Sequence, residues 1–289
     1  MVKIDKKSLR FYAFTFLQNM KLGIFDSGLG GLTVLRSINE LLPELSTVYF
    51  GDNANTPYGT KSFEEIFAHT LDGVRFLFAQ GCPLVILACN TASAQALRKI
   101  QQEILPREFP DRRVLGVIRP TVEYLIEETD TKNIGVFATP ATVRSEAYAH
   151  EFNKIMAGVS RQVFLCQKAC SGLVEAVEAG QINSPETKKL VEGYCRGFEG
   201  DLALLGCTHY PFLEPLFHMY LPPGTRVFTS GPIVAKKLKK YLERHAEIDK
   251  QLDRSGERIF YTTGEPEVVM VNTLKFYPGK IDWQPVFLD

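Results

Sequence analysis

Two apolar runs in this sequence end in the same way, each in a cysteine followed by small polar residues. The first covers residues 84–88 and ends in Cys89, and the second covers residues 202–206 and ends in Cys207. Short unbroken apolar runs are typical of parallel strands that are buried on both faces. Open α/β sheets bind their ligands at the carboxyl ends of such strands. Both cysteines are therefore candidates for a binding or catalytic site.

The repetition of the pattern matters more than either cysteine alone. A single buried cysteine has an ordinary structural explanation, because free cysteine is among the most buried residue types. Residues 134–139 align with residues 22–27, and each segment precedes its own cysteine strand by a similar distance. The sequence therefore predicts an α/β fold of two similar lobes related by a pseudo-twofold axis. Mainly parallel sheets flanked by helices form each lobe, with the active site in the cleft between them.

The expected elements divide the chain into three parts. Residues 1–20 are basic with a short apolar patch, too short for a membrane span and without a cleavage site, and are an extension that is either disordered or a mis-assigned start. Residues 21–117 and 230–289 are assigned to the first lobe, and residues 118–229 to the second. Helices are expected over residues 63–78, 92–100 and 233–244, and a strand over residues 113–118. Residues 258–264 are expected to return and pack on the first lobe.

Composition limits the class of partner. Lys and Arg together number 33, as do Asp and Glu, so net charge gives no reason to expect nucleic acid or an anionic membrane as a partner. A small molecule is the expected partner. The six cysteines show no paired CxxC spacing, which disfavours a zinc site, and a chain of 289 residues does not need disulfides. A reducing cytoplasm with free thiols is expected.

A glycine-rich loop follows the first expected strand. Gly28, Gly30 and Gly31 lie shortly after Asp26 and before a helix, so backbone N–H groups can approach an anion at the start of that helix. The spacing is not that of a dinucleotide fingerprint, and a carboxylate ligand fits as well as a phosphate. Asp26 either caps the helix or takes part in chemistry.

Two facing thiols suit the inversion of an α-carbon in an amino acid. One thiolate removes the α-proton and the opposite thiol donates another proton to the other face. The pKa of cysteine, about 8.5, can be moved towards neutrality by its surroundings. Asp26 and His209 are the candidates that manage these protons. A Cys–His hydrolase, a metal site with His209 and a two-lobed binding protein remain as alternatives, although none of them accounts for both thiols.

Motifs spread from about residue 22 to about residue 242 resemble those of glutamate racemases, in the aspartate/glutamate racemase superfamily. They are residues 25–31, 49–52, 57–59, 88–92, 138–142 and 205–211. The resemblance implies a cytoplasmic isomerase that converts L-glutamate into D-glutamate without a cofactor or metal. It also implies a homodimer that supplies D-glutamate for peptidoglycan, and thus a role in cell wall biogenesis and cell shape.

The resemblance also assigns roles to individual residues. It implies that Cys89 and Cys207 are the acid/base residues, assisted by Asp26, His209 and Glu178. Glu175, one helical turn before Glu178, is the competing match for the glutamate. The implied substrate-binding residues are Asp26, Ser27, Tyr58, Gly59, Asn90, Thr91, Thr142, Thr208 and His209. The sequence departs from the family pattern at Arg119, where glutamate is common.

Two other functions remain open from the residues. The first is an aspartate racemase or a related enzyme of the same superfamily, because one methylene of substrate changes binding by only about 1–3 kcal/mol. The second is a two-lobed amino-acid-binding protein without turnover, which would bind glutamate but exchange no α-proton.

Overall fold

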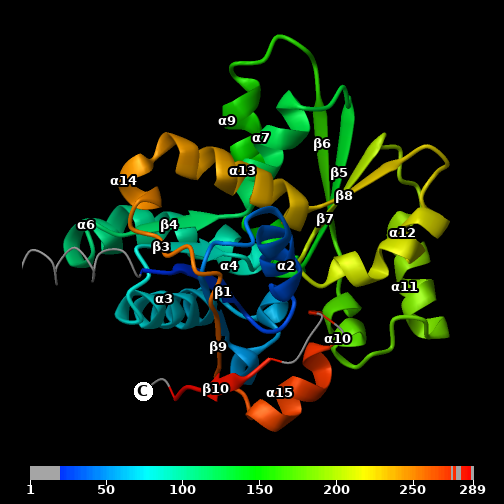
Figure 1. The fold of residues 1–289 in the computed structure, drawn as a ribbon. Helices are drawn as coiled ribbons and strands as arrows, with labels where there is room; N and C mark the ends of the chain where they lie inside the picture. Colours follow the sequence, from blue (N-terminus) through cyan, green and yellow to red (C-terminus); the bar gives the residue numbers. More distant parts are fainter. Residues whose placement is uncertain (1–19, 275, 278–280, 288–289) are drawn as a thin grey trace, which may run out of the picture.

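The chain folds into two parallel sheets, each flanked by helices (Figure 1). The computed structural model describes residues 20–274, 276–277 and 281–287, so the predicted extension lies outside the described residues except for Met20. The six strands of the first sheet are β1 (Leu22–Asp26), β2 (Thr47–Gly51), β3 (Leu84–Leu87), β4 (Arg113–Gly116), β9 (Arg258–Thr262) and β10 (Trp283–Pro285). The four strands of the second sheet are β5 (Asn133–Ala138), β6 (Phe164–Ala169), β7 (Leu202–Gly206) and β8 (Arg226–Thr229).

The order of the strands repeats between the sheets. The first sheet runs β10-β9-β2-β1-β3-β4 and the second runs β6-β5-β7-β8, and every pairing is parallel. The segment β2-β1-β3-β4 therefore corresponds to β6-β5-β7-β8. In each sheet, the strand before the cysteine pairs with the strand that comes first in the sequence. β3 pairs with β1, and β7 pairs with β5. This arrangement confirms the predicted α/β fold with two similar lobes, which we call the first and second lobe after their sheets.

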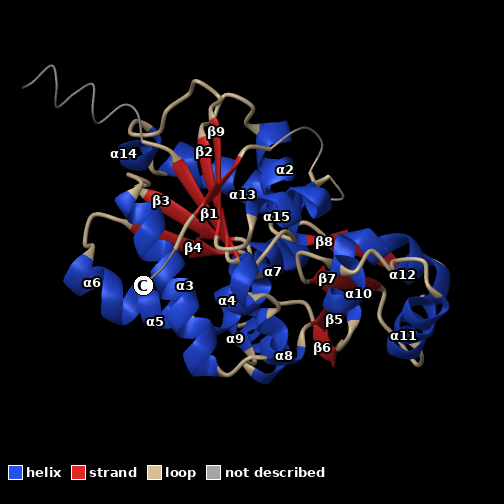
Figure 2. Ribbon diagram, turned by 90° about the horizontal axis from the view of Figure 1, so that it is seen from below, coloured by secondary structure: helices blue, strands red, loops and turns tan. Residues whose placement is uncertain are grey.

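The strands before the cysteines are buried as their sequences predict. Every residue of β3 and β7 is buried, and so is every residue of β1. Aliphatic side chains on both faces of a strand need cover on both sides of the sheet. Helices supply that cover, as Figure 2 shows.

The helices vary widely in length and connect successive parallel strands. In and around the first lobe they are α2 (Leu32–Leu41), α3 (Phe63–Ala79), α4 (Asn90–Gln95), α5 (Leu97–Lys99), α6 (Leu105–Glu108), α13 (Ser230–Arg244), α14 (Ala246–Asp249) and α15 (Pro266–Thr273). In and around the second lobe they are α7 (Ile118–Glu127), α8 (Pro140–Arg144), α9 (Ala147–Met156), α10 (Leu173–Glu178), α11 (Pro185–Cys195) and α12 (Glu214–Tyr220). Helix α13 packs against both α2 and α7, and so joins the two lobes.

Three predicted boundaries are wrong. The strand expected over residues 113–118 ends at Gly116, because α7 already begins at Ile118. The helix expected over residues 233–244 begins three residues earlier, at Ser230. In both cases a proline occupies the first turn of the helix, where its missing N–H has no intrahelical partner to lose. The helix expected over residues 92–100 is divided at Ala96 into α4 and α5.

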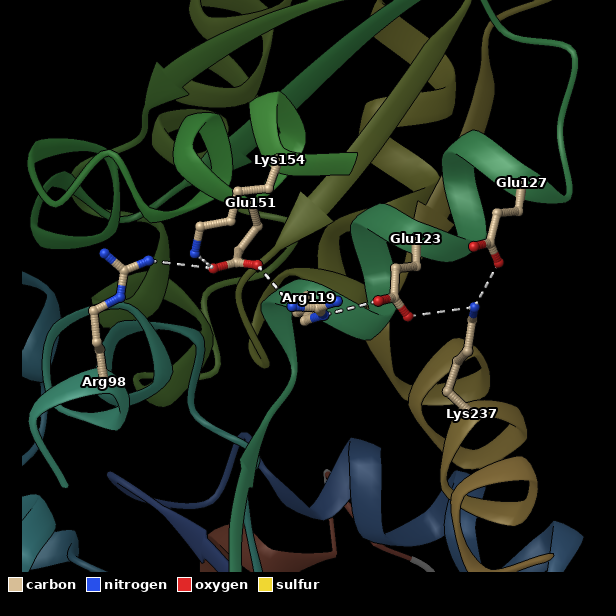
Figure 3. A network of polar contacts seen from close by, with 7 residues as sticks. All are labelled: Arg98, Arg119, Glu123, Glu127, Glu151, Lys154 and Lys237. Atoms are coloured by element: carbon tan, nitrogen blue, oxygen red, sulfur yellow. Dashed lines mark hydrogen bonds and ion pairs between the residues drawn. The ribbon is translucent and has the colours of Figure 1, made fainter. Parts of the chain in front are cut away.

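Ion pairs connect the helices on one side of the lobe boundary (Figure 3). Glu151 of α9 pairs with Arg98 of α5 at 3.4 Å and with Lys154 at 2.9 Å. Arg119 pairs with Glu123 at 2.8 Å, and Lys237 of α13 reaches Glu123 at 3.6 Å. Arg119, the departure from the family pattern, therefore belongs to this network. Exposed pairs of this kind contribute about 0–1 kcal/mol each, so packing carries most of the stability.

None of the helices in the described part of the chain is both long enough and apolar enough to cross a membrane.

Gly73 lets helix α3 lie close to the first sheet. A Cβ atom at Gly73 would lie 2.3 Å from the ring of Phe25, which is fully buried in β1. In Gly73→Ala the overpacking costs about 1–3 kcal/mol and outweighs the gain in helix propensity of about 1 kcal/mol. We therefore predict a lower free energy of unfolding, measured by urea denaturation.

Gly193 in α11 supplies the matched control, because a Cβ atom there meets nothing within 4 Å. Gly193→Ala is expected to raise the free energy of unfolding by up to about 1 kcal/mol. Equal stability of Gly73→Ala and the unchanged protein would contradict the account of close packing at α3.

Candidate active site

The two predicted cysteines line one small cavity between the lobes. Cys89 follows β3 and Cys207 follows β7, and their exposed fractions are only 5 % and 7 %. The cavity has a volume of about 10 Å³. The other predicted site residues that line it are Ser27, Tyr58, Gly59, Asn90, Thr91, Thr208 and His209. Asp26, Thr142 and Glu178 lie behind this lining and contact it through hydrogen bonds.

Cys89 is buried among groups that bond to its sulfur. Its thiol donates to the Ser27 hydroxyl at 3.5 Å, and its sulfur accepts from the Ala92 amide at 3.5 Å. Burial raises the pKa of Cys89 to about 12, and the nearby Asp26 carboxylate adds to this rise. Cys89 is therefore a neutral thiol at neutral pH.

Cys207 belongs to a different arrangement. Its sulfur lies 3.9 Å from Nδ1 of His209, and Nε2 of His209 lies 2.6 Å from the Glu178 carboxylate. Burial lowers the pKa of His209, but its hydrogen bonds with Cys207 and Glu178 outweigh burial and raise the pKa to about 10. His209 is therefore positively charged at neutral pH. The structure brings Glu178, rather than the exposed Glu175, to this histidine.

Asp26 is fully buried beneath the glycine loop. Its carboxylate accepts a hydrogen bond from the Gly28 amide at 3.1 Å and from the Thr208 hydroxyl at 3.4 Å. Burial raises the pKa of Asp26, and the positive charge of His209 opposes that rise. The carboxylate bonds within its own loop and to the second lobe, whereas α2 has no side-chain cap.

The glycine loop makes a close contact between the lobes. A Cβ atom at Gly30 would lie 2.5 Å from His209 Nδ1 and 2.5 Å from the Thr208 hydroxyl. Only a residue without a side chain allows this approach. The loop predicted to approach an anion therefore also packs directly on the histidine of the opposite lobe.

Hydroxyl and amide groups form the rest of the lining. Thr91 of the first lobe lies 2.9 Å from the Thr139 hydroxyl and 3.2 Å from the Thr142 hydroxyl, both in the second lobe. Asn90 accepts a hydrogen bond from Tyr148 at 2.7 Å through Oδ1, while its buried Nδ2 has no hydrogen-bond partner among the described residues. A buried donor without a partner is costly, so Nδ2 is suited to an acceptor on a ligand.

Tyr58 contributes to the site in a different way from its neighbours. Its hydroxyl donates to the buried Asp52 carboxylate at 2.6 Å. This hydrogen bond fixes the ring. Tyr58 and Gly59 both line the cavity, and Gly59 lies next to Thr139.

Residues that the sequence analysis did not identify complete the site. Tyr148 holds Asn90, and Thr139 lines the cavity. Phe276, after α15, packs edge to face against His209 with ring centroids 5.7 Å apart. Thr139 stood within a quoted motif, but no local pattern marks Tyr148 or Phe276, because each acts across a long sequence separation.

The site offers no cluster of metal ligands. No group of three or more His, Cys, Asp or Glu residues in the described part of the chain is placed to hold a metal ion. A cavity of about 850 Å³ lies elsewhere, beside the ion-pair network of Figure 3. The thiols, the charged histidine and the unpaired amide instead converge on the small cavity.

A family model described as Asp/Glu/Hydantoin racemase matches residues 22–238. The chain belongs to this racemase family. Among its relatives, glutamate racemase from Ruegeria pomeroyi is 42% identical over 277 residues, covering 91% of this chain and 98% of the relative. Two solved glutamate racemases share the fold of this racemase. The Bacillus anthracis isoform has a TM-score of 0.84 at 29% identity, and the Francisella tularensis enzyme, solved with D-glutamate, has 0.81 at 28%. Each alignment covers 94% of this chain and 98% or 99% of the other.

The charge state of His209 predicts a pH dependence of stability. Its pKa of about 10 in the folded racemase exceeds its ordinary value of 6.5. The stabilisation is complete below pH 6.5 and is lost as the pH rises towards 10. Between pH 6.5 and 8.5 we predict a fall in the free energy of unfolding of up to about 1.4 kcal/mol per pH unit. Urea denaturation at several pH values measures this fall.

Glu178→Gln should reduce this pH dependence, because it removes the carboxylate that bonds to His209. Glu175→Gln, one turn earlier on the exposed face of α10, is the matched control and should leave the dependence unchanged. Identical pH dependence in Glu178→Gln and the unchanged protein would show that this pair does not set the charge of His209.

Proposed function

We propose that this protein is a glutamate racemase that uses Cys89 and Cys207 as its two bases. The observation that carries the proposal is the meeting of both thiols in one cavity, each with its own polar partners. Two monoprotic groups on opposite faces of one carbon atom can remove a proton from one face and return one to the other. Family membership and the names of the relatives at about 40% identity support glutamate as the substrate.

The proposed chemistry has one proton removed and one added. In one direction, a thiolate takes the α-proton and the opposite thiol donates its proton to the other face of the carbanion. The two sulfurs exchange protonation states, and the reverse reaction exchanges them again. His209 and Glu178 assist Cys207, while Asp26 and Ser27 assist Cys89. The positive charges of the substrate ammonium group and of His209 stabilise negative charge on the sulfurs and the carbanion.

The substrate carboxylates are expected to meet donors from both lobes. Asn90, whose Nδ2 has no partner among the described residues, lines the cavity with the hydroxyl-bearing Ser27, Thr91 and Thr208. Tyr58 and Gly59 also line it. Thr142 acts through its hydrogen bond with Thr91. Preorganised donors of this kind stabilise the charge of a substrate without the cost of reorganisation.

Substrate entry requires the lobes to separate. A volume of about 10 Å³ holds no more than one water molecule. An amino acid therefore reaches the thiols only after the contacts between the lobes open, and the closed state excludes water around the reacting carbon atom. Closure of this kind is a common way to protect an unstable intermediate.

The wider role follows from the same resemblance. We propose that the enzyme works in the cytoplasm as a homodimer and supplies D-glutamate for peptidoglycan, and thus for cell wall biogenesis and cell shape. An aspartate racemase is the second candidate, because one methylene separates the substrates. Comparing the rates of racemisation of L-glutamate and L-aspartate distinguishes them. A binding protein would racemise neither.

Substitution of the two thiols tests the mechanism. In Cys89→Ser and Cys207→Ser we predict that the rate of glutamate racemisation, followed by circular dichroism, falls at least about 100-fold, because a hydroxyl is a much poorer acid and base at neutral pH.

Cys82→Ser is the matched control. Cys82 precedes β3, at the opposite end of the strand from Cys89, and burial raises its pKa to about 12 as well. Cys82→Ser should keep the rate of the unchanged protein, since it lies away from the cavity. Full activity of either Cys89→Ser or Cys207→Ser would exclude the two-thiol mechanism.

A further inference from the structure

The two ends of the Asn90 side-chain amide have different surroundings. Asn90 lines the cavity with the thiols, and its Oδ1 atom accepts the hydroxyl of Tyr148 at 2.7 Å. Its Nδ2 group is buried and finds no hydrogen-bond partner among the described residues. One end of the amide is therefore occupied by protein and the donor end is left for a ligand.

The direction of this amide decides whether it attracts or repels a carboxylate. The two ends of an asparagine amide have nearly the same shape, but only the NH₂ end donates hydrogen bonds. With the amide turned round, Oδ1 would face the anionic substrate and Nδ2 would face Tyr148. A neighbouring group must therefore hold the amide with Nδ2 towards the substrate before the substrate binds.

Tyr148 is able to hold the Asn90 amide in this orientation. The residue is fully buried in α9, and a buried hydroxyl needs an acceptor for its proton. Asn90 Oδ1 accepts this proton at 2.7 Å, and the side chain of Ser230 also lies within hydrogen-bonding reach of the hydroxyl. Reversal of the amide would place a donor opposite the Tyr148 hydroxyl and remove the 2.7 Å hydrogen bond that the hydroxyl now donates. Burial also raises the pKa of Tyr148, so the hydroxyl keeps its proton at neutral pH.

We infer that Tyr148 is a positioning residue that orients the Asn90 amide so that Nδ2 donates to a carboxylate of the substrate. The inference rests on the proposed function and adds a residue to it. Tyr148 belongs to the second lobe and Asn90 to the first. The donor for the carboxylate is therefore oriented only when the lobes are together, which links recognition of the substrate to closure.

Removal of one hydroxyl tests the inference without opening a cavity. Tyr148→Phe is expected to raise KM for both L- and D-glutamate about five- to tenfold, with kcat within about twofold of the unchanged enzyme, because a contact made equally in ground and transition states affects KM alone. Tyr261→Phe is the matched control, since its hydroxyl donates to the amide oxygen of Gln80 at 3.2 Å, on β9 and away from the site. Its KM should not change.

A double-mutant cycle with Asn90→Ala separates positioning from structural support. If Tyr148 acts through the amide, Tyr148→Phe will have no further effect on KM once Asn90 is alanine. An equal rise in KM in both backgrounds would overturn the inference, and so would an unchanged KM in Tyr148→Phe alone. A decrease of kcat together with the melting temperature would also overturn it in favour of a structural role.

The test of Tyr148 and the test of the proposed function fail in different ways. The unchanged protein must racemise glutamate before either KM is defined, so failure there removes the function. Racemisation by the unchanged protein with no effect of Tyr148→Phe would remove only this inference.

Discussion

The burial of two thiols in one cavity, away from water, is the constraint on which the rest of the structure depends. Equivalent strands of two parallel sheets, β3 and β7, carry Cys89 and Cys207 at their carboxyl ends. Because these ends face each other, both cysteines line one cavity with a volume of about 10 Å³. Burial away from water strengthens every charge interaction at the cavity and also makes a lone thiolate costly. The surrounding groups have to supply compensating charges and hydrogen bonds.

The two sides of the cavity meet this requirement differently. Next to Cys207, the His209 imidazole is charged at neutral pH and is held by Glu178, Gly30 and Phe276. Next to Cys89, a hydroxyl and a backbone amide replace the positive charge. The pseudosymmetry of the fold therefore does not extend to the electrostatics. A racemase needs one base deprotonated and the other protonated at the start of each turnover, and unequal surroundings favour such a division.

The sequence predicts the strands and the paired cysteines well because these features are local. An unbroken apolar run identifies β3 and β7, and the repeated pattern predicts their equivalent places in the two sheets. The contacts that complete the site are not local. Tyr148 reaches Asn90 across 58 residues, and Phe276 reaches His209 from the far end of the chain. Such pairs depend on how the lobes pack against each other, and the periodicity of the sequence does not predict this packing.

The position of deuterium early in the reaction tests the central claim most directly. L-Glutamate is incubated with the unchanged enzyme in deuterated water, and NMR compares the product with the recovered substrate at low conversion. Two monoprotic bases predict deuterium at the α-carbon of newly formed D-glutamate while the remaining L-glutamate keeps its protium, and the converse from D-glutamate. Equal deuterium in substrate and product would indicate a single base. No exchange with either enantiomer would contradict the racemase account altogether.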